Sequence, residues 1–558
     1  MNKRINQQKG ITLIALVITI VVLLILAGVS VSTLIGENGI INKTKEAKIE
    51  SEISNVKEQA RIDISTSEIE KQGEVLTEPE LYEILIKYGN IGNNSKGEKV
   101  LITNDKKYEI PIKDIYVGET IKVDNNDLFD FDSTTGTILG IKEKYVKEKN
   151  GKKCINDDRY FTDRMGVCIL KDDIDVLIVP SEINGVKVKK IKNLGVVNVK
   201  TIIVEEGIEE FEEFNGRYRD GEEEYVQKLE KAKLPSTLKK MGDGTFSGCE
   251  YLKEVNIPEG IESIGFMCFS SCERLKEIKL PESLKELTGN AIVGCNSLVE
   301  IRIPKNVEKL EHGLSSGRNL ERIEVDKDNK NYCSLDGVLF DKDKKILKIY
   351  PNAKKDKMYS VPKAVEKIES IINNKILESI EVDKGNKKFS SLDGVLMNKD
   401  KTELIQYPGG RKETTYTIPE TVKIIGNHSF FSNKNIKEIR MFDNVETIDT
   451  RAFCWCQNLE NITLSKNLKT IGWTAFGECN SLKTIEMPEG LNKIDGGAFI
   501  SCTGLTRIDV PSSVTIIGES AFSGCDNLKL INIKKPSGSI KNQSEWGIDE
   551  KIIEWNDN

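Results

Sequence analysis

Residues 488–510 read PEGLNKIDGGAFISCTGLTRIDV, and a similar stretch opens at residue 511 with another proline. The prolines that start such stretches follow a constant 23-residue spacing or a multiple of it. They are Pro235, Pro258, Pro281, Pro304, Pro419, Pro488 and Pro511. A fixed period of this length is typical of a solenoid, in which each coil buries its apolar face only against the neighbouring coils.

Within one period the apolar residues predict where the chain faces inward. Ile508 and Val510 alternate with polar residues, as in a short strand. Leu491 and Ile494 form a second inward edge, and a glycine pair at 496–497 marks a turn. We therefore predict a mainly β repeat solenoid with parallel strands along one face.

Phenylalanine and cysteine follow the same period, which predicts a structural ladder inside the coils. Its members are Phe246, Phe269, Phe430, Phe453, Phe476, Phe499 and Phe522, with Cys249, Cys272, Cys295, Cys456, Cys479, Cys502 and Cys525. Parallel side chains on successive rungs disfavour disulfide geometry, so we expect buried free thiols. Two further cysteines, Cys154 and Cys168, lie outside this column, and both a disulfide between them and free thiols remain open.

The period carries a resemblance to a known family. Residues 257–265 and 521–525 are similar to the unit of the BspA-like leucine-rich repeat, I-P-x-x-V-x-x-I-G-x-x-A-F-x-x-C. The likeness covers about residues 175–535, and 179–185 look like the entry coil of that family. It implies a cell-surface protein that binds proteins of a host matrix or of other bacterial cells, with no cofactor and no catalysis.

Three segments interrupt the period. Residues near 328–350 and 385–407 resemble each other, and alternation around 341–344 predicts a hairpin in the first of them. The charged insert near 215–233 has a composition that suits a helix. The last segment, 536–558, leaves the period and is predicted to cap the terminal coil.

The amino-terminal end predicts a membrane segment. Residues 1–10 are basic, and 11–35 contain no charged residue, a length that can cross a bilayer of about 30 Å. The junction of Gly10 and Ile11 is similar to the prepilin peptidase site of type IV pilins, which implies a cut there and an apolar helix retained on the mature protein. Ala15 stands where pilins usually have glutamate.

This resemblance leaves several roles open for the amino-terminal part. The helix is expected to continue as a stalk through 36–63, followed by a small β-rich head and lead-in over 64–174. The predicted location is the cell membrane, crossed once, with the repeat region outside the cell. The alternatives are a plain signal anchor and a minor pilin or pseudopilin that contacts other pilin-like subunits.

Composition narrows the classes of function. The formal net charge is −7 and no basic cluster occurs beyond the leader, so nucleic acid is not an expected partner. Only two histidines, His312 and His428, are present, and they lie several coils apart. Acid pairs such as Asp326 with Asp328 lack the glycine and glutamate of a calcium loop. We therefore predict that the protein is not an enzyme and holds no metal.

The outward side chains of the strand form the candidate binding face. Acidic and basic residues lie side by side in neighbouring columns, and the candidate residues are Glu254, Glu277, Glu300, Arg302, Arg322, Arg440 and Arg507. Neighbouring columns of opposite charge permit lateral ion pairs of at most about 1 kcal/mol each. The columns contain no aromatic residue, and both a solvated charge-balanced surface and a protein-binding surface remain open.

Overall fold

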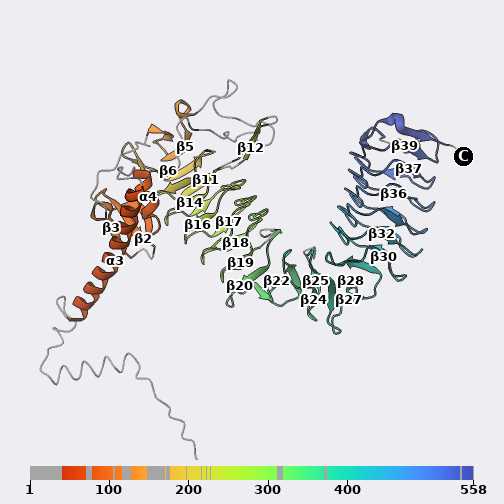
Figure 1. Cartoon of the computed structure of the whole chain (residues 1–558), viewed down its shortest axis with the longest axis horizontal. Helices are drawn as coiled ribbons and strands as arrows, with labels where there is room; N and C mark the ends of the chain where they lie inside the picture. Colours follow the sequence, from red (N-terminus) through yellow and green to blue (C-terminus); the bar gives the residue numbers. More distant parts are fainter. Residues whose placement is uncertain are drawn as a thin grey trace, which may run out of the picture. The chain divides into compact units, whose positions relative to one another are not determined.

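The computed structural model describes residues 40–70, 78–104, 107–115, 127–146, 170, 176–196, 198–214, 217–220, 223–226, 228–310, 314, 318–369, 374–540 and 543–556 (Figure 1). The chain divides into two compact units. Unit 1 holds the described residues up to 128 together with 176–188 and 203–208. Unit 2 holds 129–170, 189–202 and everything from 209 onward.

Unit 1 is built on a long helix and a small antiparallel sheet of order β1-β2-β3. Its elements are α3 (Ile40–Glu70), α4 (Glu78–Leu85), β1 (Gly89–Asn93), β2 (Lys99–Thr103), β3 (Glu109–Pro111), η1 (Ile112–Asp114), β6 (Val176–Val179), β7 (Glu182–Ile183) and β8 (Val186–Lys187). At 1.5 Å per residue, α3 is about 46 Å long.

The carboxyl-terminal half of α3 supplies the buried residues by which the helix packs on unit 1, and Glu52 and Ile53 add contacts just before it. Ala60 and Ile64 are buried in a core with Leu85, Leu101 and Ile110, whereas the side chains of residues 47–51 are exposed. Residues 47–51 of the helix thus lie outside this core, and their role as a stalk stays a prediction.

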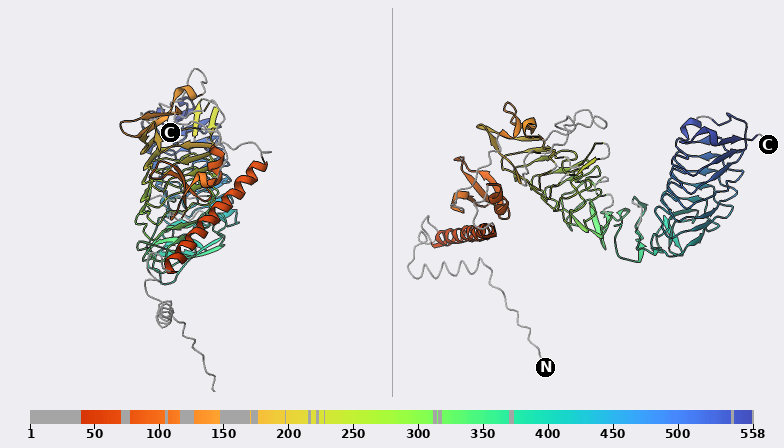
Figure 2. Two further views of the ribbon diagram at one scale, coloured as in Figure 1. Left: turned by 90° about the vertical axis from the view of Figure 1, so that its left-hand side faces the viewer. Right: turned by 45° about the horizontal axis from the view of Figure 1, so that its top comes forward.

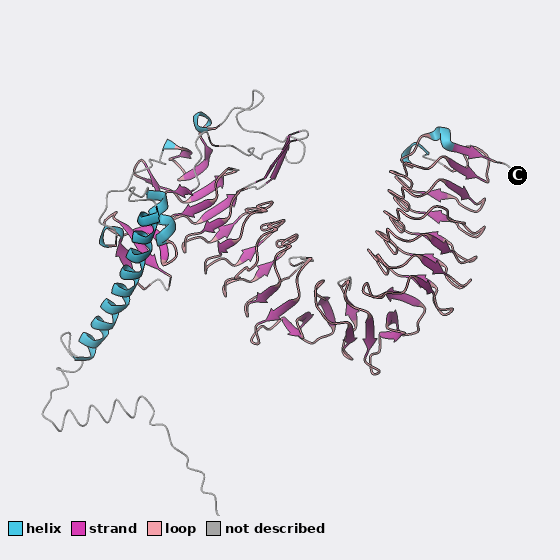
Figure 3. Cartoon of the chain, in the orientation of Figure 1, coloured by secondary structure: helices cyan, strands magenta, loops and turns pink. Residues whose placement is uncertain are grey.

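Unit 2 is a solenoid whose coils supply short parallel strands to two ladders, although some coils lack one of the two strands (Figure 3). The first ladder contains β14 (Lys231–Lys233), β16 (Glu254–Asn256), β19 (Glu300–Ile303), β20 (Arg322–Val325), β24 (Met358–Val361), β26 (Ser379–Val382), β30 (Thr415–Thr417), β32 (Glu438–Arg440), β34 (Asn461–Thr463), β37 (Arg507–Val510), β39 (Leu530–Ile533) and β40 (Ile553–Trp555). The boundary between the units crosses β10 (Thr201–Val204).

The second ladder runs along the inward edge that the sequence marks with residues such as Ile494. It contains β9 (Lys190–Asn193), β11 (Glu210–Glu213), β15 (Lys240–Met241), β17 (Ser263–Ile264), β18 (Glu286–Leu287), β25 (Lys367–Ile368), β31 (Ile424–Ile425), β33 (Thr447–Ile448), β35 (Thr470–Ile471), β36 (Lys493–Ile494) and β38 (Ile516–Ile517). The prediction of a mainly β solenoid with 23-residue coils is confirmed, because Ile448 pairs with Ile471 and Ile471 with Ile494. A regular ladder on this second edge was not predicted.

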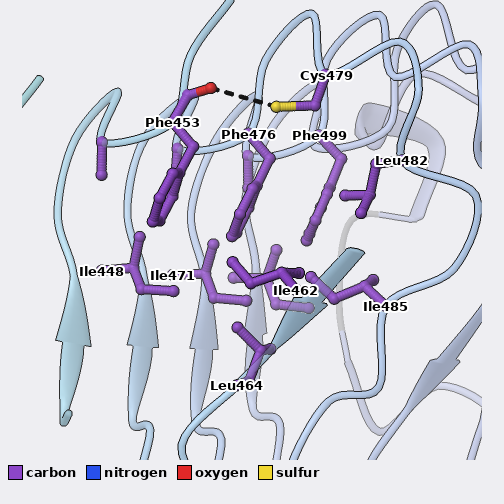
Figure 4. Packing of buried hydrophobic residues seen from close by; sticks show 14 of the residues in the cluster. Ile448, Phe453, Ile462, Leu464, Ile471, Phe476, Cys479, Leu482, Ile485 and Phe499 are labelled. Atoms are coloured by element: carbon purple, nitrogen blue, oxygen red, sulfur yellow. Dashed lines mark hydrogen bonds between the residues drawn. The ribbon is translucent and has the colours of Figure 1, made fainter. Parts of the chain in front are cut away.

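Each coil closes around a column of apolar side chains. Figure 4 shows the phenylalanine rings of three successive coils above the isoleucines of the second ladder, and Figure 2 shows the coils stacked side by side (right-hand view, blue). Phe476, Leu482 and Ile471 are fully buried. A single coil leaves both faces of this column open, so stacking supplies the burial, about 1.5–3 kcal/mol for each large side chain.

Two three-stranded meanders interrupt the first ladder. The first consists of β21 (Tyr332–Leu335), β22 (Val338–Asp341) and β23 (Ile346–Ile349), and the second of β27 (Phe389–Leu392), β28 (Val395–Asn398) and β29 (Glu403–Gln406). The hairpin predicted around 341–344 is formed by β22 and β23. Ile323 N donates to Gly337 O of the first meander at 2.9 Å, so β20 pairs with one strand only. A side chain at Gly337 would collide with Arg322, since an added Cβ lies 2.8 Å from Arg322 Cβ.

The expectation of a helix in the charged insert is wrong. β12 (Arg217–Asp220) and β13 (Glu223–Val226) form an antiparallel hairpin in which Tyr218 lies opposite Tyr225. Charged residues alternate with aromatic ones there, and this period of two favours strands over a helix.

Both ends of unit 2 add elements outside the regular coils. Before the repeats lie β4 (Phe129–Asp132), β5 (Thr137–Ile141) and η3 (Glu143–Tyr145), and β5 pairs in parallel with β9. After them come η4 (Gln543–Glu545) and η5 (Glu550–Ile552), which lead into β40. Trp546 is fully buried against the last coil, and Trp555 packs partly on the same core. Residues 543–556 thus cover the apolar face of the last coil.

Residues 1–39 lie outside the described residues, and so do the predicted leader, the apolar segment 11–35 and the Gly10–Ile11 junction. Among the helices that are described, none combines the length and the apolar character needed to span a membrane.

Candidate functional site

The phenylalanine and cysteine columns form two hydrogen-bonded and stacked stretches, one over residues 246–295 and one over 430–525. Phe453 and Phe476 stack with ring centroids 5.3 Å apart and planes at 6°, and Phe476 and Phe499 repeat this at 5.3 Å and 5°. Each ladder thiol also donates to a phenylalanine carbonyl in the preceding coil. The Cys479 thiol, for example, donates to Phe453 O at 3.2 Å (Figure 4).

Burial makes these thiols poor nucleophiles. It raises the pKa of Cys456 to about 12 and that of Cys525 to about 11. The ten cysteines within the described residues are all free, whereas Cys154 and Cys168 lie outside them. The ladder is therefore a packing element, and its thiols contribute hydrogen bonds that the sequence did not predict.

The seven residues of the candidate face are all exposed, and each one has an ionic partner. Their contacts are Glu254 with Lys231 (3.5 Å), Glu277 with Lys279 (3.6 Å), Glu300 with Arg322 (3.7 Å), Arg302 with Asp326 (2.5 Å), Arg322 also with Glu324, Arg440 with Glu438 (2.8 Å) and Arg507 with Asp509 (2.6 Å). Pairing within the surface makes it charge-balanced.

The ion pairs act on the acids of this face as expected. Arg507 lowers the pKa of the Asp509 carboxyl, and Arg440 lowers that of Glu438. The face is also less regular than the sequence suggests, because Glu277 belongs to a segment outside any strand. Exposed pairs of this kind contribute little to stability, so the columns remain available to a partner that replaces their mutual contacts.

Acidic residues in the first meander and just before it accept hydrogen bonds from the backbone. Asp341 Oδ1 accepts a hydrogen bond from Ile346 N at 2.6 Å, and Asp326 Oδ1 accepts one from Asp328 N at 2.9 Å. Asn386 is buried and uses all its polar atoms: its Nδ2 donates to Pro362 O and Val365 O, and its Oδ1 accepts from two backbone amides. Across the part of the chain with described coordinates, no three potential ligands gather as a metal site would require.

A groove of about 890 Å³ lies on the second ladder between β9, β11, β15 and β17. Lysines and acids both line it, including Lys239, Lys240, Glu212 and Asp243. Its charges are partly paired, as in the contact of Lys239 with Glu209 at 2.7 Å. The mixed lining gives the groove no preference for a ligand of one charge.

One surface was missed by the sequence reasoning. Trp455 and Trp473 are 48% and 45% exposed, yet they lie in the turns between the two ladders and not on the columns. His428, in the corresponding turn one coil earlier, is half-buried, and burial lowers its pKa. His312 lies outside the described residues. An alignment of the coils at the 23-residue period could have indicated this surface, because Trp455 occupies a position that Ser432 and Ser501 hold in other coils.

Short coils of constant length with an inward strand, an aromatic column and brief outer turns define a leucine-rich repeat protein. Residues 224–344 and 411–529 match the BspA type leucine rich repeat region in six copies, and the chain is similar to that family over these residues. The search of curated proteins found no match.

Several solved structures are similar in part. A leucine rich cell surface protein from Faecalibacterium prausnitzii is 23% identical, with 67% of this chain and 92% of that chain covered and a TM-score of 0.42. A leucine-rich repeat protein from Eubacterium ventriosum is 23% identical, with 64% of this chain and 87% of that chain covered and a TM-score of 0.40. The pneumococcal vaccine antigen PcpA is 20% identical, with 70% of this chain and 88% of that chain covered and a TM-score of 0.33.

Proposed function

We propose that this chain is a cell-surface protein that binds other proteins through its repeat region. The observation that carries the proposal is the match of two segments of unit 2 to BspA-type repeats. The exposed columns support it, since their ion pairs are weak enough to be exchanged for contacts with a partner. Matrix proteins of a host and surface proteins of other bacteria are the partners that the family likeness suggests.

The proposed attachment is a single membrane span over residues 11–35, with the repeats outside the cell. No residue of this segment carries a charge. Beyond it, α3 begins at Ile40 and is exposed over residues 47–51. A helix of this kind would hold the repeats away from the membrane surface.

Binding is tested with the purified full chain in detergent on an array of matrix proteins, mucins and bacterial surface proteins. We expect saturable binding to at least one of them, weakened when salt is raised because the columns are charged. Absence of saturable binding throughout the array would contradict the proposal.

A second candidate is a minor pilin or pseudopilin. The observation that favours it is the construction of unit 1, in which the carboxyl-terminal half of α3 packs on a small domain containing the antiparallel strands β1, β2 and β3. Cleavage between Gly10 and Ile11 belongs to this proposal, while Ala15 argues against standard filament docking. Mass spectrometry of the mature amino terminus is the test: a methylated Ile11 supports pilin-type processing, and an intact Met1 contradicts it.

A further inference from the structure

The turns between the ladders force particular residues into a left-handed backbone conformation. One turn position has positive φ in five successive coils, at Ser432 (56°), Trp455 (65°), Glu478 (62°), Ser501 (55°) and Gly524 (71°). The conformation is required because the backbone of this residue joins neighbouring coils, as in Trp455 N to Gly477 O at 2.8 Å. Glycine and small polar residues adopt it most readily, whereas a bulky side chain is strained there.

Packing does not explain why a tryptophan occupies this position. The Trp455 side chain is 48% exposed, so burial offsets the strain only in part. Serine at 432 and 501 completes the same turn. A strained bulky residue on an exposed turn is typical of a functional surface, where the free energy of binding a partner offsets strain that burial on folding does not.

A second aromatic residue and an arginine lie in the same group of turns. The Arg451 guanidinium carbon lies 4.5 Å from the centroid of the Trp473 ring, and Arg451 N donates to Trp473 O at 2.9 Å. Gly496 leaves room for this indole, because an added Cβ would lie 3.2 Å from Trp473 Cδ1. The ring is thereby held between the turns of the preceding and following coils.

Arg451 differs from the arginines of the columns in having no ionic partner among the described residues. Arg302, Arg322, Arg440 and Arg507 each contact a carboxylate. The nearby Asp449 carboxylate is directed to the backbone, where it accepts from Thr450 N at 2.7 Å. A guanidinium placed over an indole face interacts with the ring through its charge, and its N–H groups stay able to donate to a carboxylate.

We propose that Arg451, Trp455 and Trp473 form a docking patch for a protein segment that presents a carboxylate beside an apolar side chain. The carboxylate binds the Arg451 guanidinium, and the apolar side chain covers the Trp455 indole. Tryptophan and arginine are the residues most enriched where protein interfaces concentrate their binding energy. A glycan fits less well, because Arg451 already covers one face of the Trp473 ring and sugars stack on free faces.

The inference rests on the proposed function of protein binding, and the test separates the two. The full chain in detergent is used to select short random peptides displayed on phage. Patch variants are Trp455→Ser, matching Ser432, and Arg451→Thr, matching Thr474 of the following coil. The control is Arg274→Thr, at an arginine that also lies over an aromatic ring (Tyr251, 4.1 Å) but belongs neither to the patch nor to the columns, and Arg507→Ser tests the columns separately. Thermal melting, expected to be unchanged or higher for Trp455→Ser, shows that the coils remain folded.

We expect the selected peptides to place Asp or Glu next to an aromatic residue or leucine. Their affinity should fall about tenfold or more in both patch variants and stay unchanged in the control. Selected peptides that bind the Trp455→Ser variant with the same affinity as the natural chain would overturn the patch. If Arg507→Ser alone reduces binding, the patch is refuted while protein binding stands. Binding to a glycan array but to no peptide or protein refutes both proposals.

Discussion

Replacing Phe476 by leucine tests whether the coils are held together by ring stacking between neighbours. Phe476 is fully buried and stacks on Phe453 and Phe499, both at 5.3 Å. Phe522 is equally buried but stacks on one phenylalanine, Phe499, at 5.9 Å. Leucine keeps most of the apolar burial and removes the ring pairs.

The expected magnitudes follow from the number of ring pairs. Each pair contributes about 0.5–1.5 kcal/mol beyond area burial. Phe476→Leu should therefore cost about 1–3 kcal/mol from lost stacking and Phe522→Leu about half as much. The smaller volume of leucine adds a similar cost at both positions, so the difference between the variants isolates one ring pair.

The assay is amide hydrogen exchange of the full chain in increasing urea, read by mass spectrometry on peptides covering residues 465–487 and 511–533. Each coil contacts only its neighbours, so the loss should be greatest around the substituted coil. Phe442→Leu, at a side chain that is 43% exposed, is the control and should change little. Equal losses of local stability in Phe476→Leu and Phe522→Leu would refute the role of stacking. A loss of stability in Phe476→Leu no larger than that in the control would refute it too.

Three further outcomes are expected. Iodoacetamide at pH 8 should leave Cys479 and the other ladder thiols unmodified until urea unfolds the coils, because all of them are buried and burial also raises the pKa of Cys479; peptide mapping that finds them modified in the native chain would contradict this. Asn386→Ala should destabilise the second meander by about 2–4 kcal/mol, since several buried backbone groups lose their partner, and urea titration measures the loss. Arg507 lowers the pKa of Asp509, so the stabilisation from this pair is present above about pH 4 and lost as pH falls through the folded pKa. Acid melts of Asp509→Asn should therefore be flatter than those of the natural chain below that pH, and parallel melts would count against the pair.

Much of the repeat fold could be predicted because one pattern recurs in almost every coil. The 23-residue spacing of proline, phenylalanine and cysteine fixes which side chains point inward, and the structure buries Phe476 and Cys479 accordingly. The charged insert was misjudged because composition suggested a helix where an alternation of two residue types produces the β12–β13 hairpin. The thiol hydrogen bonds were missed because they join residues in different coils.

The candidate site could be predicted only in part from the sequence. The columns could be drawn from the alignment, and their exposure follows from the alternation along the strand. Some of their ionic contacts join residues two apart in one coil, as for Arg507 and Asp509. Others depend on how neighbouring coils are aligned, as for Glu300 and Arg322 in adjacent strands. The docking patch was missed because its residues occupy different positions of the repeat: Arg451 and Trp455 lie in one turn and Trp473 in the next.

The sequence by itself therefore determined the repeat, the coil that it builds and the interior of that coil, because a periodic pattern places the same side chain in the same surroundings each time. The tertiary structure decided where the first ladder is interrupted, which charges pair between coils, and that a tryptophan is held with positive φ on an exposed turn. These features arise between coils, from backbone geometry and from side chains a full coil or more apart in the chain, and a linear pattern does not contain those distances.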